Sequence, residues 1–125
     1  MCKKILVLDD DLAILDAVGD VLEYGGYEVC KLTRGDEIFE RIEDYHPDLI
    51  LLDVMLADQD GREICKKIKQ DEHQEIASIP VILISATHDL SKSLNQQGAP
   101  NDFVAKPFDI EHLLYKIEHQ LDQAA

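Results

Sequence analysis

The chain has 125 residues, 46% of them apolar and 30% charged, and its 26 acidic against 12 basic residues give a formal net charge of −14. This length predicts one globular domain over residues 1–125, with no room for a second. The acidic balance argues against a nucleic-acid surface, which needs a basic patch. No apolar run has the length of a membrane span or a signal peptide, so we expect a cytoplasmic protein that contacts neither nucleic acid nor membrane directly.

The cysteines and histidines do not form a metal or redox motif. Cys2, Cys30 and Cys65 are odd in number and lack metal-ligand or C-x-x-C spacing, so we expect reduced thiols. The five histidines are scattered along the chain, which favours surface positions over a zinc cluster.

Short apolar runs alternate with amphipathic stretches from the start of the chain. The first run, residues 4–8, stops at three consecutive aspartates and predicts a strand. Apolar residues then recur at helical spacing from 14 to 22. Asp11 has the position of an N-cap for this helix, and Gly25-Gly26 has that of a C-terminal stop.

The middle of the chain repeats this alternation. Residues 27–32 predict a second strand. Residues 35–45 predict an amphipathic helix that ends before Pro47, because the position before a proline disfavours helix. The apolar run 48–52 follows and suits a strand buried on both faces of a parallel sheet.

The second half of the chain adds two more strands and two more clear helices. Gly61 opens a helix whose basic residues, Lys69 among them, we expect to face water. A polar stretch leads to a buried strand over 79–84. A short strand over 101–105 and an amphipathic helix behind an Asp109 N-cap complete the pattern.

Strands that alternate with helices over the whole length predict an α/β three-layer sandwich with about five parallel strands and right-handed crossovers. In such a sheet the C-terminal ends of the strands meet and form the site. Charged or hydroxyl residues lie at or directly after the ends of four of these strands, and we expect them to converge: Asp9, Asp10, Asp53, Ser85 and Lys106.

The residue types in this cluster suit phosphoryl chemistry. Convergent carboxylates repel one another unless a cation lies among them, and their oxygens are what Mg²⁺ or Mn²⁺ prefers. Lys106 offers a positive charge to a phosphate oxygen, and Ser85 offers a hydroxyl donor. Because the sequence contains neither glycine-rich nucleotide motif, the cluster predicts a site for one phosphoryl group with a carboxylate as acceptor.

Simpler roles are open to single members of the cluster and its neighbours. Asp11 fits a helix cap better than a metal ligand. Ser85 and Thr87 could serve only to cap the following segment, and Lys106 could be a surface lysine in a turn. Together these interpretations would leave the charged ends of successive apolar strands unexplained, so we favour a convergent site.

Four stretches, in order, resemble the receiver domain of two-component response regulators, in particular its single-domain, chemotaxis-regulator-like form. They are Ile5 to Asp11, Asp48 to Leu56 with Asp60-Gly61, Pro80 to Ala86, and Gly98-Ala99 with Asp102 to Phe108. The resemblance runs from about residue 3 to 121. It implies the flavodoxin-like strand order 2-1-3-4-5.

The resemblance also implies a reaction. Asp53 would accept a phosphoryl group from a phosphohistidine on a sensor histidine kinase or a histidine phosphotransfer protein. Asp10 and Asp53 would bind Mg²⁺ with the backbone carbonyl of Met55, and Asp9 would assist. The protein would not be a classical enzyme, although it would catalyse its own phosphorylation and a slow autodephosphorylation.

A switch follows from the same resemblance. Lys106 would pair with the phosphoryl group, Ser85 would hydrogen-bond it, and Phe103 would turn inward as Ser85 is drawn towards the phosphate. Residues 88–97 carry two apolar side chains, so little packing resists their movement. We expect this segment, the last strand and the last helix to form a surface that an unknown downstream protein reads.

The chain departs from the family pattern in the loop after Asp53, and two other positions bear on the lifetime of the phosphorylated state. Ala57 stands where the family usually has proline, which predicts a looser loop after Asp53. Met55 and Thr87 flank the approach of water, and Met55 has no polar side chain to orient it. We therefore predict a long-lived acyl phosphate.

Two other functions fit parts of the sequence. A Mg²⁺-dependent phosphohydrolase with Asp53 as nucleophile would usually carry a second aspartate at position 55, where this chain has Met55. A phosphorylation-independent interaction domain would not need the complete acidic, hydroxyl and lysine set. The sequence leaves open a monomer or a phosphorylation-dependent dimer, and a stand-alone chain or part of a larger regulator.

Overall fold

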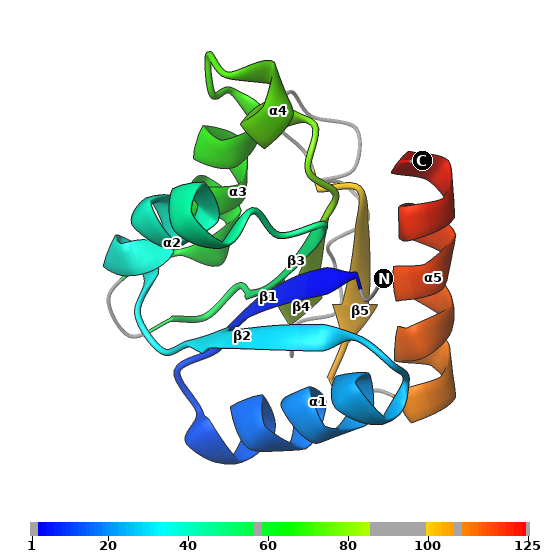
Figure 1. The fold of residues 1–125 in the computed structure, drawn as a ribbon. Helices are drawn as coiled ribbons and strands as arrows, with labels where there is room; N and C mark the ends of the chain where they lie inside the picture. The colour runs from blue at the N-terminus through cyan, green and yellow to red at the C-terminus, as the bar shows by residue number, and fades with distance from the viewer. Residues whose placement is uncertain (1–2, 57–58, 86–99, 107–108, 125) are drawn as a thin grey trace.

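The computed structural model describes residues 3–56, 59–85, 100–106 and 109–124. Its strands form one parallel sheet in the order β2-β1-β3-β4-β5 (Figure 1). This order confirms the flavodoxin-like arrangement. The strands are β1 (Lys4–Leu8), β2 (Glu28–Leu32), β3 (Leu49–Asp53), β4 (Val81–Ser85) and β5 (Asp102–Ala105).

Helices cover both faces of the sheet, which makes the predicted three-layer sandwich. Figure 1 shows α1 and α5 on one face and α2 and α3 on the other. The helices are α1 (Leu12–Tyr24), the short 3₁₀ helix η1 (Gly35–Glu37), α2 (Ile38–Tyr45), α3 (Gly61–Lys69), α4 (Gln74–Ala77) and α5 (Ile110–Ala124). None of the helices formed by the described residues has the length and apolar character to cross a bilayer.

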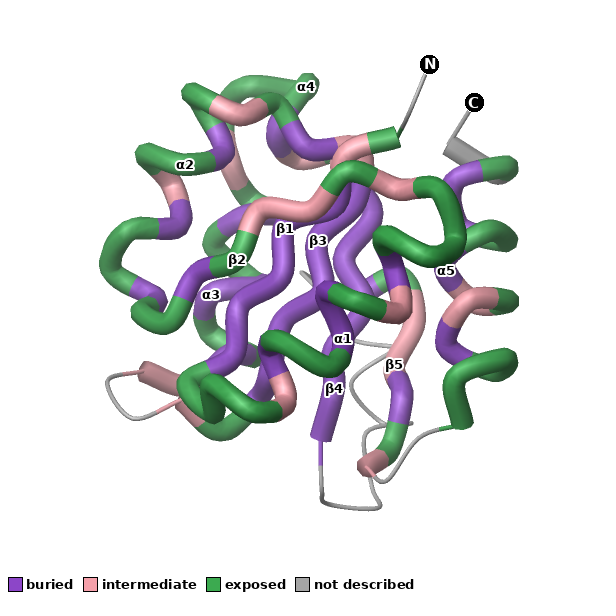
Figure 2. The backbone as a smooth tube through the Cα atoms, turned by 60° about the horizontal axis from the view of Figure 1, so that its bottom comes forward, coloured by how far each residue is buried: buried purple, intermediate pink, exposed green. Residues whose placement is uncertain are grey.

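The position of β3 in the middle of the sheet explains why its sequence is apolar without alternation. Ile50 and Leu52 belong to the core cluster beneath α2 and α3, whereas Leu49 and Leu51 belong to the cluster beneath α1 and α5. Successive side chains of a strand point to opposite faces. Because both faces are covered, every residue of β3 is buried (Figure 2).

The predicted N-cap residues of α1 and α5 cap these helices in the structure. The Asp11 side chain accepts hydrogen bonds from the backbone N–H groups of Ala13 and Ile14, and so caps α1. Asp109 accepts from the N–H of Glu111 at 3.2 Å at the start of α5. These bonds satisfy donors that the first turn of a helix leaves unpaired.

The end of α3 differs from the expectation that Lys69 faces water. Lys69 is half-buried, and its Nζ donates to the carbonyl oxygen of Ile79 at 2.8 Å. The last turn of α3 lies beside the segment that leads into β4, so the lysine meets a carbonyl there instead of solvent. Burial lowers the pKa of Lys69.

Two further local features were not anticipated. One helical turn, α4, forms within the polar stretch before β4. His46 ends α2 in the left-handed conformation, with φ 54°, while its N–H donates to the carbonyl of Ile42 at 3.0 Å. The following proline disfavours the helical region for His46, and histidine is among the residues that enter the left-handed region more readily.

Some expectations fall on positions outside the described residues: Cys2, Ala57, Thr87 and the segment 88–97. Cys30 and Cys65 lie within the described part, where neither forms a disulfide.

Candidate functional site

The C-terminal ends of the five strands lie level with one another. The backbone N–H of Asp9 donates to Leu32 at 3.1 Å, that of Val54 to Ile84 at 2.9 Å, and that of Lys106 to Ser85 at 2.7 Å. Sheet-like pairing thus continues one residue beyond β1, β3 and β5. This pairing fixes the backbone from which the site residues project.

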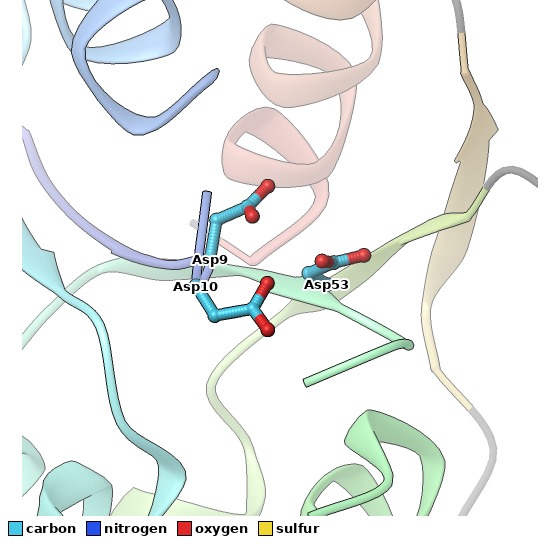
Figure 3. A group of neighbouring side chains, drawn as sticks. All are labelled: Asp9, Asp10 and Asp53. Carbon is cyan, nitrogen blue, oxygen red and sulfur yellow. The ribbon is translucent and has the colours of Figure 1, made fainter. Parts of the chain in front are cut away.

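Three carboxylates gather at this edge of the sheet (Figure 3). Asp9 and Asp10 follow β1, Asp53 ends β3, and one oxygen of each lies within 4.8 Å of the others. Asp9 and Asp53 are only 2% and 4% exposed, whereas Asp10 is exposed. The cluster therefore has a buried floor and a side that opens to solvent.

Lys106 is the cation paired with this cluster among the described residues. Its Nζ lies 3.3 Å from Oδ2 of Asp9 and 3.5 Å from Oδ1 of Asp53. Three carboxylates against one ammonium leave two negative charges uncompensated when all are ionised. A site with this charge and with oxygen donors on three sides fits a hard divalent cation such as Mg²⁺ or Mn²⁺.

The pKa of Asp53 reflects both its burial and the uncompensated charge beside it. Burial, followed by the charge of Asp9, raises the pKa of Asp53 to about 6 from its usual value of 3.8. Lys106 and the backbone N–H of Met55, which donates to Oδ1 of Asp53 at 3.4 Å, act in the opposite direction without overcoming it. A further cation beside Asp53 would therefore be favourable.

The chain returns close to Asp53 after the loop that follows β3. Met55 and Asp60 form an isolated antiparallel bridge, and the N–H of Gly61 donates to the carbonyl of Val54 at 2.8 Å. A Cβ atom on Gly61 would overlap the backbone carbonyl of Asp53. Glycine is thus required here by close backbone approach.

Met55 lies at the rim of the site. Its side chain is 65% exposed, and its N–H contacts the Asp53 carboxylate. This position agrees with a residue that borders the approach to Asp53. Its backbone carbonyl as a metal ligand stays a prediction.

Ser85 and Phe103 come from the two neighbouring strands. Ser85 ends β4, is fully buried and pairs in register with Ala105. Phe103 is half-buried on β5 and packs against the core beneath α2 and α3. The two residues lie on adjacent strands of the sheet. Their roles in a switch stay a prediction.

The sequence did not single out a contact that touches Phe103 directly. Lys116 on α5 pairs with Asp102 on β5, and its Nζ lies 5.4 Å from the centroid of the Phe103 ring. Asp102 lies in the fourth stretch that resembles the family, but Lys116 belongs to no motif, so no signal in the sequence pointed to the pair. The role of Gly61 could have been suspected from the Asp60-Gly61 turn signal.

Comparisons with known proteins agree with this architecture. The family model of the response regulator receiver domain matches residues 5–118. The chain is 36% identical over 116 residues to a DNA-binding dual master transcriptional regulator, RpaA, of Synechocystis; the match covers 91% of this chain and 47% of that regulator. The chain thus spans about half the length of this relative.

Solved structures give the same result. A CheY-like response regulator receiver domain protein from Methanospirillum hungatei superposes with a TM-score of 0.85 at 32% identity, over 99% of this chain and 97% of that one. A BeF3-activated DrrB receiver domain superposes with a TM-score of 0.81 at 32% identity, over 98% and 99% of the two chains. Its fold and these matches show that the chain belongs to the receiver domains of response regulators.

Proposed function

We propose that this chain is a phosphorylation-activated signalling receiver in which Asp53 accepts a phosphoryl group from the phosphohistidine of a sensor kinase or a histidine phosphotransfer protein. The observation that carries the proposal is the setting of Asp53. It is a buried carboxylate at a strand end, with Asp9 and Asp10 on one side and the Lys106 ammonium 3.5 Å away. A buried, under-compensated carboxylate is a reactive group rather than a stabilising one.

The donor set fits Mg²⁺, with Mn²⁺ as the alternative. Asp9, Asp10 and Asp53 would hold the ion together with the backbone carbonyl of Met55. When bound, it would neutralise charge on the transferred phosphoryl oxygens. The exposed side of the cluster, at Asp10, leaves room for a cation and a phosphoryl group to enter.

The transfer itself needs few protein groups. An oxygen of ionised Asp53 forms a bond to phosphorus as the N–P bond of the donor histidine breaks, and the electron pair returns to the imidazole nitrogen, which takes up a proton. Lys106 is placed to hold one phosphoryl oxygen, and the Ser85 hydroxyl to donate to another. Burial of Asp53 excludes water from the side facing the sheet.

The phosphoryl group carries about one and a half to two negative charges, which replace the single charge of the Asp53 carboxylate. In the proposed switch, Ser85 moves towards these charges and Phe103 turns inward. The response is read from the segment 88–97, β5 and α5 by a downstream protein, through a monomer or a phosphorylation-dependent dimer. The name of the Synechocystis relative indicates a transcriptional output for that protein; the output of this chain is to be found by capture with and without activation.

The direct test is incubation with acetyl phosphate and Mg²⁺, followed by intact-mass measurement. We expect a gain of one phosphoryl group that is lost in Asp53→Asn and without Mg²⁺. Asp20→Asn, which removes an exposed carboxylate from α1, is the matched control and should be phosphorylated normally. No mass gain, or a gain that survives Asp53→Asn, would overturn the proposal.

A further inference from the structure

Lys116 forms a compact contact with two neighbouring residues of β5. Its Nζ lies 2.7 Å from Oδ1 of Asp102 and 5.4 Å from the centroid of the Phe103 ring. The side chains of Lys116 and Asp102 are only 19% and 21% exposed. An ammonium within about 6 Å of a ring centroid is attracted to the ring face, and the attraction grows as water is excluded.

Asp102 fixes this ammonium in place. The same oxygen, Oδ1, accepts from Lys116 and from the backbone N–H of Phe103 at 2.8 Å. The carboxylate is therefore held by the strand that carries the ring. Lys116 is in turn held over the ring, and α5 is tied to β5 at this point.

We propose that Lys116 is a positioning residue that holds the Phe103 ring in its present place and so opposes activation at Asp53. This inference rests on the proposed function, because it concerns the same switch. Phe103 packs on the face of the sheet covered by α2 and α3, whereas α5 covers the opposite face. A turn of the ring towards Ser85 would therefore take it away from the Lys116 ammonium. The Asp102 bond does not depend on the ring, so Lys116 stays on α5 as the ring leaves.

The energetic consequence follows from linkage. A contact made only in the resting position lowers the population of the activated one, and a ligand that favours the activated position then binds more weakly. An exposed or partly buried cation–π contact corresponds to a change of about two- to fivefold in such an equilibrium. Removing the charge of Lys116 should therefore strengthen the binding of a phosphoryl mimic by about this factor.

The experiment compares Lys116→Met, which keeps an unbranched side chain and removes the charge, with Lys116→Arg, which keeps a cation. The probe is BeF3⁻ with Mg²⁺, measured by titration. We expect Lys116→Met to lower Kd about two- to fivefold, and Lys116→Arg to match wild type. Lys67→Met, at an exposed position of α3, is the matched control and should leave Kd unchanged.

A second readout follows the ring itself. The chain has three phenylalanines, so labelling with 4-fluorophenylalanine gives few ¹⁹F signals, and Phe103→Leu assigns the one of interest. Without BeF3⁻, Lys116→Met should move the Phe103 signal towards its BeF3⁻-bound position. A merely structural role for Lys116 would leave the ring signal where it is.

A double-mutant comparison separates coupling through the ring from a general effect on α5. In a Phe103→Leu background, Lys116→Met should leave Kd unchanged. An equal effect in that background, or wild-type Kd in Lys116→Met, would overturn the inference while the proposed function stands. Failure of the wild-type chain to bind BeF3⁻ would overturn both.

Discussion

Nζ of Lys106 lies 3.5 Å from Oδ1 of Asp53, which is longer than the 2.7–2.9 Å typical of a charge-assisted hydrogen bond. The lysine also lies 3.3 Å from Asp9, so it is shared between two carboxylates and closes fully on neither. The site therefore keeps negative charge that Lys106 does not neutralise. This charge should affect both the binding of Mg²⁺ and the pH dependence of stability.

Mg²⁺ should stabilise the folded chain. An ion that binds the folded state but not the unfolded one raises the free energy of unfolding by RT ln(1 + [Mg²⁺]/Kd), about 2.7 kcal/mol at a hundredfold excess over Kd. We expect thermal unfolding to shift upwards with Mg²⁺ in wild type and in Asp20→Asn. Asp10→Asn should lose most of the shift, and an equal shift in this variant would argue against the proposed ligand set.

The pH dependence of stability should carry the signature of Asp53 in metal-free protein. Its pKa is about 6 in the folded state against 3.8 in the reference state, so between these values the folded chain keeps a proton that the unfolded chain has released. The contribution of Asp53 to the free energy of unfolding therefore falls as pH rises through this window, and the full penalty is present at pH 7.

Asp53→Asn removes this penalty. We expect the variant to be more stable than wild type by about 1–2 kcal/mol at pH 7 in the presence of a chelator, with the difference shrinking towards pH 4. Denaturant unfolding of both proteins across this pH range measures it. The difference in the free energy of unfolding between variant and wild type isolates the contribution of Asp53. Carboxylates with lowered pKa, such as Asp60 and Asp71, make stability rise with pH, but they do so equally in both proteins. A difference that grows towards acid would contradict the prediction.

Gly61→Ala should be destabilising and should impair the site at the same time. The added Cβ would overlap the carbonyl of Asp53, so either α3 or the end of β3 must move. We expect a loss of about 1–3 kcal/mol in the free energy of unfolding, as for overpacked sites, together with slower phosphorylation by acetyl phosphate. Gly25 has an unstrained φ of −75°, and a Cβ there would lie 3.3 Å from Cδ2 of the Leu114 side chain, which is free to shift slightly. Gly25→Ala should therefore be tolerated far better than Gly61→Ala.

The phosphorylated state should be long-lived. Met55 lies at the rim of the site with a thioether that is a poor hydrogen-bond acceptor for water. After removal of the donor, we expect the added mass to persist for minutes in wild type. Met55→Asn introduces a polar side chain at the rim and should shorten the lifetime severalfold. Decay of the wild-type phosphoryl group within seconds would refute the idea.

The fold and the ends of its strands could be predicted from the sequence because the signals are local. Apolar runs 4–8 and 48–52 each stop at an acid, and parallel topology brings such ends to one edge without any knowledge of side-chain contacts. The caps at Asp11 and Asp109 are likewise read from a few adjacent residues. Parallel β-strands joined by helices leave few alternative arrangements.

The remaining features depend on distant packing. Lys69 meets Ile79 only because α3 crosses beside the segment leading into β4, and a helical pattern alone places such a lysine in water. Lys116 and Asp102 are 14 residues apart and on different elements, so their pairing has no periodic signature. The distance at which Lys106 stands from Asp53 is also a property of the assembled sheet.

The bond from the Phe103 N–H to Asp102 has a consequence for the outer border of the sheet. β5 lies at one end of the strand order, and the N–H of Lys106 points to β4. Because N–H groups alternate along a strand, that of Phe103 points outwards, where an incoming strand would need it. Asp102 already occupies this donor. An incoming strand would have to displace the Asp102 carboxylate to pair with Phe103, so Asp102 weakens β5 as a template for a neighbouring chain at this position.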